Sequence, residues 1–225
     1  MKETANNSQL IAACGLYCGA CKKFLNEQCA GCQPSEEDNS GLGQSLTDDE
    51  KEMKIELATI QEYESVIAFY DDVTARTPEM AVYARWSKGK HPTEEGIRAY
   101  IDEGSMYVYK EGGEIIAAMA VTMYQGEDYH AIEWNQQVAD NKVAVIHILA
   151  VSPGKQGEGI GSKMIREAIH LAKANGMQAI RLDALASNSP AHKLYERLGF
   201  EYRGQQHLYA ENTGWTDFYF FELKQ

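Results

Sequence analysis

The stretch that runs from Val143 to Gly161, VAVIHILAVSPGKQGEGIG, decides the fold of this chain. Its first nine residues form a nearly continuous apolar run, which is typical of a strand buried on both faces. The dipeptide Pro153-Gly154 ends that strand. Residues 160–174 then carry apolar side chains at helical spacing, which predicts an amphipathic helix. The sequence therefore predicts a buried strand that passes through a glycine-rich turn into a helix.

Shorter patterns on either side extend this unit into an α/β domain. Alternating or continuous apolar runs predict strands at 54–58, 106–109, 115–124, 129–134, 179–185, 200–209 and 215–223. Helical spacing predicts helices at 60–75, 93–103 and 189–198, with Thr93 as an N-cap. The order of these elements is that of an α/β fold with a mixed sheet.

The turn between the buried strand and its helix reads Gln156-Gly157-Glu158-Gly159-Ile160-Gly161. Backbone N–H groups at a helix N-terminus can hold phosphate oxygens, and glycines leave no Cβ in the way. A P-loop would end in G-K-[ST], whereas here Gly161 is followed by Ser162 and Lys163. We expect a phosphate-binding loop in which neither Gly159 nor Gly161 tolerates a side chain. The alternative is a plain glycine-rich turn.

Two motifs give the sequence a recognisable family likeness. Leu149-Ala150-Val151-Ser152-Pro153 followed by Gln156-x-x-Gly159-x-Gly161 resembles the acetyl-CoA-binding motif of the GNAT acetyltransferase superfamily. Asn188-Ser189-Pro190-Ala191-x-x-Leu194-Tyr195-x-x-Leu198-Gly199-Phe200 resembles the second motif of that superfamily. The resemblance spans residues 53–225. It implies a mixed, mostly antiparallel sheet flanked by helices, and transfer of an acetyl group from acetyl-CoA to a primary amine.

The resemblance also implies which residues hold acetyl-CoA. Backbone amides of the glycine-rich turn would bind the pyrophosphate, the strand before it would pair with the pantetheine arm, and Asn188 would contact the same arm. The implied cofactor-binding residues are Leu149, Ala150, Val151, Gln156, Gly157, Glu158, Gly159, Ile160, Gly161, Ser162, Asn188 and Ala191.

Three residues are candidates for the chemistry. The resemblance implies that Tyr195 lies near the thioester sulfur, where a phenol can protonate the leaving thiolate; the alternative is a core aromatic. His147 is a polar residue in an apolar strand and the first candidate for the base. It matches a base histidine of arylalkylamine acetyltransferases, although their second histidine is here Val145, and it could instead be a hydrogen-bonded core histidine. Glu133 is the second candidate.

Residues 33–225 contain no cysteine that could carry an acyl group and no G-x-S-x-G motif. Direct transfer in a ternary complex is therefore expected. Aromatic residues can hold an amine by cation–π contact, or can form core or a homodimer interface. The candidates to line the acceptor site are Trp86, His91, Tyr129, His130, Trp134 and Trp215. A small-molecule amine is the expected partner. The alternative function is a non-catalytic acyl-CoA-binding regulatory module, with the Cys-rich start of the chain as a protein-interaction knuckle.

All five cysteines lie near the start of the chain, in the pattern C-x3-C-x2-C-x7-C-x2-C. Two C-x2-C pairs are typical of zinc sites, which favours Cys18, Cys21, Cys29 and Cys32 as ligands, with Cys14 as an alternate. An iron–sulfur cluster or a metal-free cluster remains open. The segment resembles an uncharacterised, presumed zinc-binding bacterial domain. Composition predicts a Cys-rich segment at 1–33 and a linker at 34–52, and the family resemblance implies a GNAT domain at 53–225.

The net charge of the chain makes some classes of binding partner unexpected. The 225 residues hold 21 Lys and Arg against 33 Asp and Glu, which gives a net charge of −12. Nucleic acids and anionic membranes are therefore not expected as partners. No apolar run approaches the roughly 18 residues of a membrane span, and the polar N-terminus argues against an export signal. We therefore expect a cytoplasmic protein.

Overall fold

The computed structural model describes residues 54–223. The five cysteines and the linker lie outside the described residues, so the zinc site stays a prediction. None of the helices among residues 54–223 is long and apolar enough to cross a membrane. Nor does this part of the chain gather three His, Cys, Asp or Glu side chains in an arrangement that could hold a metal ion.

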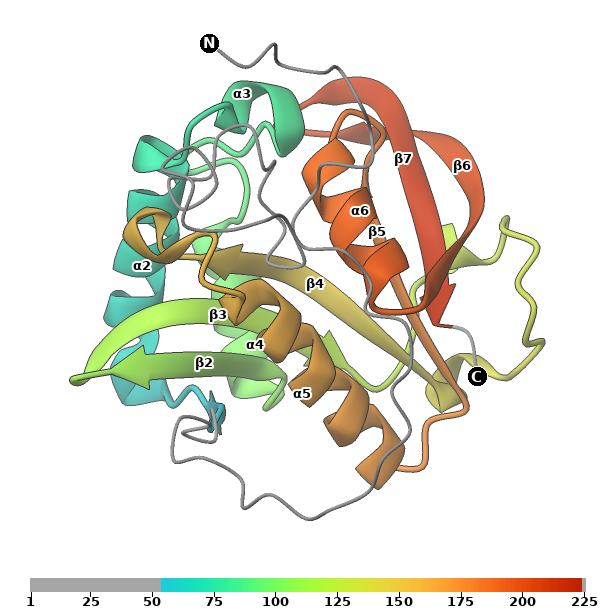
Figure 1. Cartoon of the computed structure of the whole chain (residues 1–225), viewed down its shortest axis with the longest axis horizontal. Helices are drawn as coiled ribbons and strands as arrows, with labels where there is room; N and C mark the ends of the chain where they lie inside the picture. Colours follow the sequence, from blue (N-terminus) through green and yellow to red (C-terminus); the bar gives the residue numbers. More distant parts are fainter. Residues whose placement is uncertain (1–53, 224–225) are drawn as a thin grey trace, which may run out of the picture. The chain divides into compact units, whose positions relative to one another are not determined.

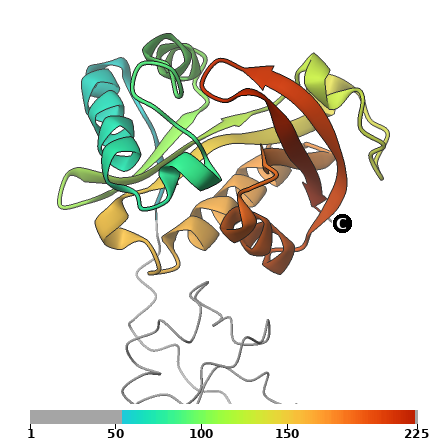
Figure 2. The same cartoon turned by 90° about the horizontal axis from the view of Figure 1, so that it is seen from above.

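The described residues form a mixed sheet covered by helices on both faces (Figures 1 and 2). The strands are β1 (Glu56–Leu57), β2 (Met106–Glu111), β3 (Glu114–Thr122), β4 (Val143–Val151), β5 (Ala179–Leu185), β6 (Phe200–Ala210) and β7 (Gly214–Leu223). The α-helices are α2 (Tyr63–Arg76), α3 (Met80–Tyr83), α4 (Glu94–Asp102), α5 (Ile160–Ala174) and α6 (Ser189–Arg197). Short 3-10 turns are η2 (Ile60–Glu62), η3 (Glu127–Tyr129), η4 (Asp140–Lys142) and η5 (Pro153–Lys155).

The strand order is β1-β2-β3-β4-β5-β7-β6, and β4 and β5 are its parallel neighbours. All the other pairs are antiparallel, so the expected mixed, mostly antiparallel sheet is confirmed. Helices α2 and α4 cover one face of the sheet, and α5 and α6 cover the other, as Figure 2 shows from above. We call these the α2–α4 face and the α5–α6 face.

Residues 143–161 have the structure predicted for them. Strand β4 and helix α5 have the predicted bounds. The first four residues of β4 are buried, as expected of a central strand, but His147, Ile148 and Leu149 are only partly buried. Thr93 caps α4, since its hydroxyl oxygen accepts the Gly96 N–H at 3.0 Å. The sequence pattern was sufficient here because a buried strand and an amphipathic helix both have strong periodicity.

The prediction of a strand at 129–134 is wrong. Tyr129 ends the 3-10 turn η3, and the following residues form a loop. The indole N–H of Trp134 donates to the carbonyl oxygen of Tyr129 at 2.7 Å, and the two rings stack. In a strand these two residues would lie roughly 17 Å apart, because each residue advances the chain by about 3.3 Å. Their alternation of apolar side chains reflects a folded-back loop that buries Tyr129, Ile132 and Trp134.

The larger remaining differences lie at the start of the domain, whereas elsewhere the ends of predicted strands shift by up to two residues. The strand predicted at 54–58 shrinks to the two residues of β1, which pair with β2 at the edge of the sheet. The helix predicted from residue 60 begins as the 3-10 turn η2, and α2 proper begins at Tyr63. Helix α3 was not predicted, since four residues are too few to show helical periodicity.

Strands β4 and β5 separate from one another at their carboxyl ends. Their parallel register runs from Val143↔Ala179 to Ile146↔Leu182, whereas the two strands continue to Val151 and Leu185. The edge of β4 that faces β5 is therefore open beyond Ile146. We call this opening the fork.

A β-bulge lies in β4 next to the fork. Ala120 of β3 pairs with His147 and Ala118 pairs with Ala150, so two residues of β4 stand opposite one residue of β3. Ile148, within the bulge, has φ of 44°, which a β-branched residue rarely adopts. The hydroxyl of Tyr70 in α2 donates to the Ile148 carbonyl oxygen at 2.9 Å and holds this conformation. Bulges of this kind bend a strand and often lie beside active sites.

Candidate active site

The fork brings chemically different groups to the two faces of the sheet. His147 and Asp183 each follow the last residue pair of the β4–β5 ladder, so their side chains project on the same side. That side is the α2–α4 face, because Tyr100 of α4 stacks on the His147 ring at 5.8 Å between centroids. Tyr195, on α6, packs edge-on against Phe221, which pairs with Leu182 and lies on the α5–α6 face.

His147 is held in an environment that keeps its ring neutral. Burial lowers the pKa of His147, and the negative charges of Asp183 and Glu103 offset only part of that effect. The hydroxyl oxygen of Thr122 lies 3.3 Å from its Nε2 atom. A neutral imidazole can accept a proton near pH 7, and the carboxylate of Asp183 would stabilise the imidazolium that results.

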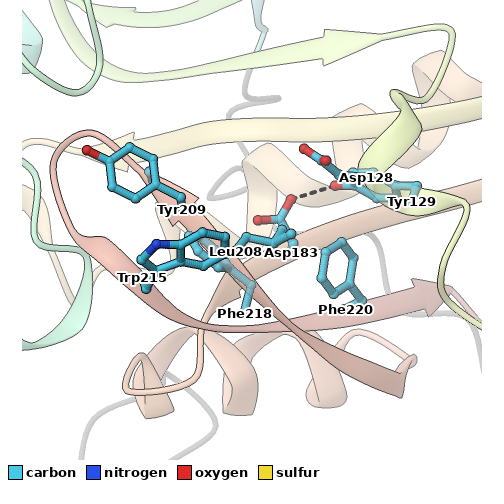
Figure 3. Close-up of a pocket in the computed structure, with 9 residues that line it drawn as sticks. Asp128, Tyr129, Asp183, Leu208, Tyr209, Trp215, Phe218 and Phe220 are labelled. Carbon is cyan, nitrogen blue, oxygen red and sulfur yellow. Dashed lines mark hydrogen bonds between the residues drawn. The ribbon is translucent and has the colours of Figure 1, made fainter.

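Asp183 stands at the centre of these interactions, although no motif marks it. The hydroxyl of Tyr129 donates to its Oδ1 atom at 2.6 Å (Figure 3). Burial lowers the pKa of His91 and His147 and raises that of Tyr195, and the negative charge of Asp183 opposes the first two shifts and adds to the third. An acid inside a strand, LDAL, was the available signal.

Tyr195 is buried, with 9% of its surface exposed. Burial, aided by the charge of Asp183, raises the pKa of Tyr195 well above its ordinary value. The phenol therefore keeps its proton at neutral pH, which suits a proton donor and not a base. Tyr195 also packs against Phe200 and Phe221, so its ring is part of the core as well.

The glycine-rich turn forms the N-terminus of α5. Gly157 and Gly159 have φ of 86° and 80°, a backbone region that favours glycine. Thr93 caps α4 and Asn188 caps α6, but Gly159 at the N-cap of α5 leaves that helix without a side-chain cap. The first N–H groups of α5, those of Ile160 and its successors, are thus available to an anion, which the helix dipole also favours.

The two glycines that were expected to exclude side chains differ in geometry. Gly159 needs its positive φ, although a Cβ there would meet no atom within 4 Å. Gly161 has ordinary helical geometry, and a Cβ would point at Leu194 and Val151, 3.6 and 3.8 Å away. These are normal van der Waals distances, so alanine fits at Gly161. The expectation that a Cβ at Gly161 would displace a bound phosphate stays a prediction, because these distances concern the protein's own atoms alone.

The other residues with an implied role toward acetyl-CoA lie in β4, the glycine-rich turn and the start of α6. The side chain of Asn188 accepts the Ala191 N–H at 3.3 Å and thereby caps α6. The amide of Gln156 donates to the Val151 carbonyl oxygen at 3.2 Å and bonds to Thr77 of the α2–α3 segment. Leu149 and Ala150 belong to the part of β4 that borders the fork. Glu158 and Ser162 belong to the glycine-rich turn and the first turn of α5.

A pocket of about 350 Å³ lies on the α2–α4 face, between the η3 segment and the β6–β7 hairpin (Figure 3). Its walls are mostly aromatic, and its only charged side chains are carboxylates. The lining residues are Asp128, Tyr129, Asp183, Leu208, Tyr209, Ala210, Trp215, Phe218 and Phe220. Because Asp183 also borders the fork, the pocket and the fork share one side chain.

A buried ion pair anchors the loop that forms one wall of this pocket. Arg181 and Glu222 are each 1% exposed and bond at 2.9 Å. Arg181 also donates to Gln125 at 2.5 Å and to the Gln136 carbonyl oxygen at 2.6 Å, and its guanidinium lies 4.0 Å from the Trp134 ring. The second oxygen of Glu222 accepts two backbone N–H groups of the same loop. This network therefore fixes the segment that carries Tyr129 onto the sheet.

The predicted acceptor-site residues fall into two groups. Tyr129 and Trp215 line the pocket, and His91, whose pKa burial lowers, lies within range of the Asp183 charge. Trp86 packs between the rings of Tyr70 and His91.

Trp134 is instead a core residue beneath Tyr129. His130 is an exposed residue, and its ring bonds to Asp140. The side chain of Glu133 is exposed, and its carbonyl oxygen accepts a bond from Arg203 of β6. The structure thus groups His147 with Asp183 and not with Glu133.

A sheet that forks beside an uncapped, glycine-rich helix N-terminus is the architecture that the sequence motifs imply for an acyl-CoA-dependent transferase. Residues 67–200 match the model of the acetyltransferase (GNAT) family. That match covers more than half of the chain. The chain therefore belongs to the GNAT family of acetyltransferases, enzymes that typically use acetyl-CoA, and is an N-acetyltransferase.

Individual relatives agree with this assignment. An uncharacterised N-acetyltransferase of Bacillus subtilis, YesJ, is 26% identical over 165 residues, which cover 67% of this chain and 89% of YesJ. Streptothricin acetyltransferase of Streptomyces lavendulae is 34% identical over 142 residues, or 63% of this chain and 67% of that protein. A GNAT acetyltransferase of Streptococcus agalactiae has the same fold, with a TM-score of 0.61 and 20% identity over 78% of this chain and 98% of that one.

Proposed function

We infer that the protein transfers an acetyl group from acetyl-CoA directly to a primary amine within a ternary complex. The observation that carries this proposal is the fork, which opens the sheet between a proton donor on one face and a proton acceptor on the other. Tyr195 lies on the α5–α6 face, and His147 and Asp183 lie on the α2–α4 face. A cofactor arm in the fork would present one carbonyl group to both.

The residues around the fork fit acetyl-CoA. The uncapped N–H groups of α5 after Gly159 suit a pyrophosphate. The positive φ at Gly157 and Gly159 favours glycine, which has no Cβ to stand in the way of a phosphate. The open edge of β4 beyond Ile146 offers backbone groups to the amides of a pantetheine arm. Acetyl-CoA, when bound, supplies the activated acetyl group.

The side chains divide the proton transfers between them. His147, kept neutral by burial, takes a proton from the acceptor amine, and Asp183 stabilises the imidazolium. Tyr195, whose raised pKa keeps its proton in place, donates that proton to the leaving thiolate. Residues 33–225 contain no cysteine that could carry the acetyl group. The acetyl group therefore passes directly to the amine, without an acyl-enzyme intermediate.

The test is an assay of thiol release from acetyl-CoA in the presence of an amine panel, together with calorimetry of acetyl-CoA binding. The wild type should release CoA only when an amine is present. Tyr195→Phe keeps the ring packing and should lower kcat about 10–10⁴-fold with little change in the acetyl-CoA Kd. Acetyl-CoA binding without amine-dependent thiol release would instead support the alternative, a non-catalytic acyl-CoA-binding regulatory module.

A further inference from the structure

The pocket beside Asp183 has a charge pattern that selects its ligand. Among its lining residues, Asp128 and Asp183 carry charge and no Lys or Arg is present. The Oδ1 atom of Asp183 accepts the Tyr129 hydroxyl, while the carboxylate as a whole borders the pocket (Figure 3). A cation entering the pocket would therefore be attracted, and a carboxylate would be repelled by both acids.

The aromatic walls add a second constraint. Phe218 and Phe220 form the floor from β7, and Trp215 and Tyr209 lie where the β6–β7 hairpin turns. Trp215 is 66% exposed and Tyr209 is 63% exposed, although both are large aromatic side chains. Trp215 stacks on His207 with 5.6 Å between the ring centroids and an interplanar angle of 10°, which fixes the orientation of its ring. Such walls bind flat apolar groups and cations alike.

The volume and the position of the pocket further limit which ligand it can hold. A volume of about 350 Å³ is at the small end of the range for small-molecule sites, roughly 300–1,000 Å³. Because Asp183 lies one residue beyond the end of the β4–β5 ladder, a ligand amine held by its carboxylate stands at the fork. The body of the ligand then extends away from the fork, toward Trp215.

We propose that this pocket is the acceptor site, and that it takes a small cationic amine joined to an aromatic or other flat apolar body, with no carboxylate beside the amine. The inference rests on the proposed acetyl transfer and names its substrate class. Asp183 binds the ammonium group of the incoming amine and holds it next to His147. The aromatic walls hold the rest of the molecule.

The test compares phenethylamine with phenylalanine, two probes that differ by one carboxylate. Each is titrated calorimetrically into the full-length protein saturated with CoA, so that no turnover is needed. Phenethylamine should bind at least about tenfold more tightly than phenylalanine, which is about 1.4 kcal/mol. Asp183→Asn should weaken phenethylamine binding and remove most of that preference. Trp215→Ala should weaken both probes and leave their ratio unchanged.

The matched control is Asp102→Asn, which removes an exposed carboxylate of α4 that pairs with Arg98 and does not line the pocket. It should leave the preference intact. Equal affinity of the wild type for the two probes, or no binding of phenethylamine, would overturn the substrate class even if Asp183→Asn failed to fold. Failure of the wild type to bind acetyl-CoA in a parallel titration would count against the proposed function itself, so the two failures are distinguishable.

Discussion

The two faces of the sheet at the fork are built in different ways. On the α5–α6 face, the candidate residues come from two continuous segments, 149–162 and 188–195. On the α2–α4 face they come from β4, β5, the η3 segment and the β6–β7 hairpin, and the loop 125–136 must be anchored to complete the pocket. A short motif can supply the backbone groups and helix ends that bind a ligand common to a whole family. A pocket for a particular acceptor instead needs side chains from several separate segments.

The largest expected effect concerns the anchor of the α2–α4 face. Arg181→Met leaves Glu222 buried without its partner, and breaking a buried ion pair in this way costs about 3–5 kcal/mol. Urea unfolding of the variant should show that loss. The exposed Arg98–Asp102 pair is the control, and Arg98→Met should change stability far less.

The same network offers a sharper check. Replacing both partners, as Arg181→Met with Glu222→Leu, should recover much of the stability because no unpaired charge remains buried. If the single and the double variants are equally destabilised, the ion pair does not act as described.

The next effect concerns the α5–α6 face. Gly159→Val places a β-branched residue at φ of 80° beside the uncapped amides, so acetyl-CoA affinity should fall by more than about tenfold. Gly161→Ala fits between Leu194 and Val151 and should bind acetyl-CoA nearly as well as the wild type. Calorimetry of both variants, with circular dichroism to confirm folding, separates backbone geometry from bulk. A strong loss in Gly161→Ala would contradict this reading of the loop.

The effect expected from His147 is on the rate of transfer, and it depends on pH. His147→Gln should lower the rate of transfer by about 10²–10⁴-fold near pH 7, because the amine then lacks its proton acceptor. The deficit should shrink as pH rises toward the pKa of the amine, where free amine is available without a base. In the wild type, burial lowers the pKa of His147, so the rate should decline only as pH falls below the usual histidine range. A pH-independent deficit would assign His147 a structural role.

The smallest effect on catalysis is expected from the cysteines at the start of the chain. If Cys18, Cys21, Cys29 and Cys32 hold zinc, the purified protein should carry about one zinc ion per chain. A chelator should remove that metal and leave acetyl transfer unchanged, since the cysteines lie outside residues 67–200, which match the acetyltransferase family model. Elemental analysis that finds neither zinc nor iron in reduced protein would contradict the metal site.

Periodicity and motifs predicted β4, α5, β5 and the two segments, 149–162 and 188–195, for which acetyl-CoA binding is proposed. Tyr195 and His147 could be selected because a motif and a lone polar residue in an apolar strand mark them. Asp183, Tyr129 and Arg181 could not be combined into one site from sequence, since they meet only through the register of β5 and the loop 125–136. The bulge at Ile148 was also beyond prediction, because no glycine or proline marks it.

The central claim is that the two faces act on a single bound pair of substrates, and the initial-velocity pattern tests it most directly. Acetyl-CoA and an accepted amine are varied together, and reciprocal rates are plotted against reciprocal concentrations. Direct transfer across the fork, from the side of Tyr195 to the side of His147 and Asp183, requires a ternary complex, so the lines should intersect. Parallel lines, which mark a covalent acyl-enzyme in a ping-pong scheme, would contradict the account.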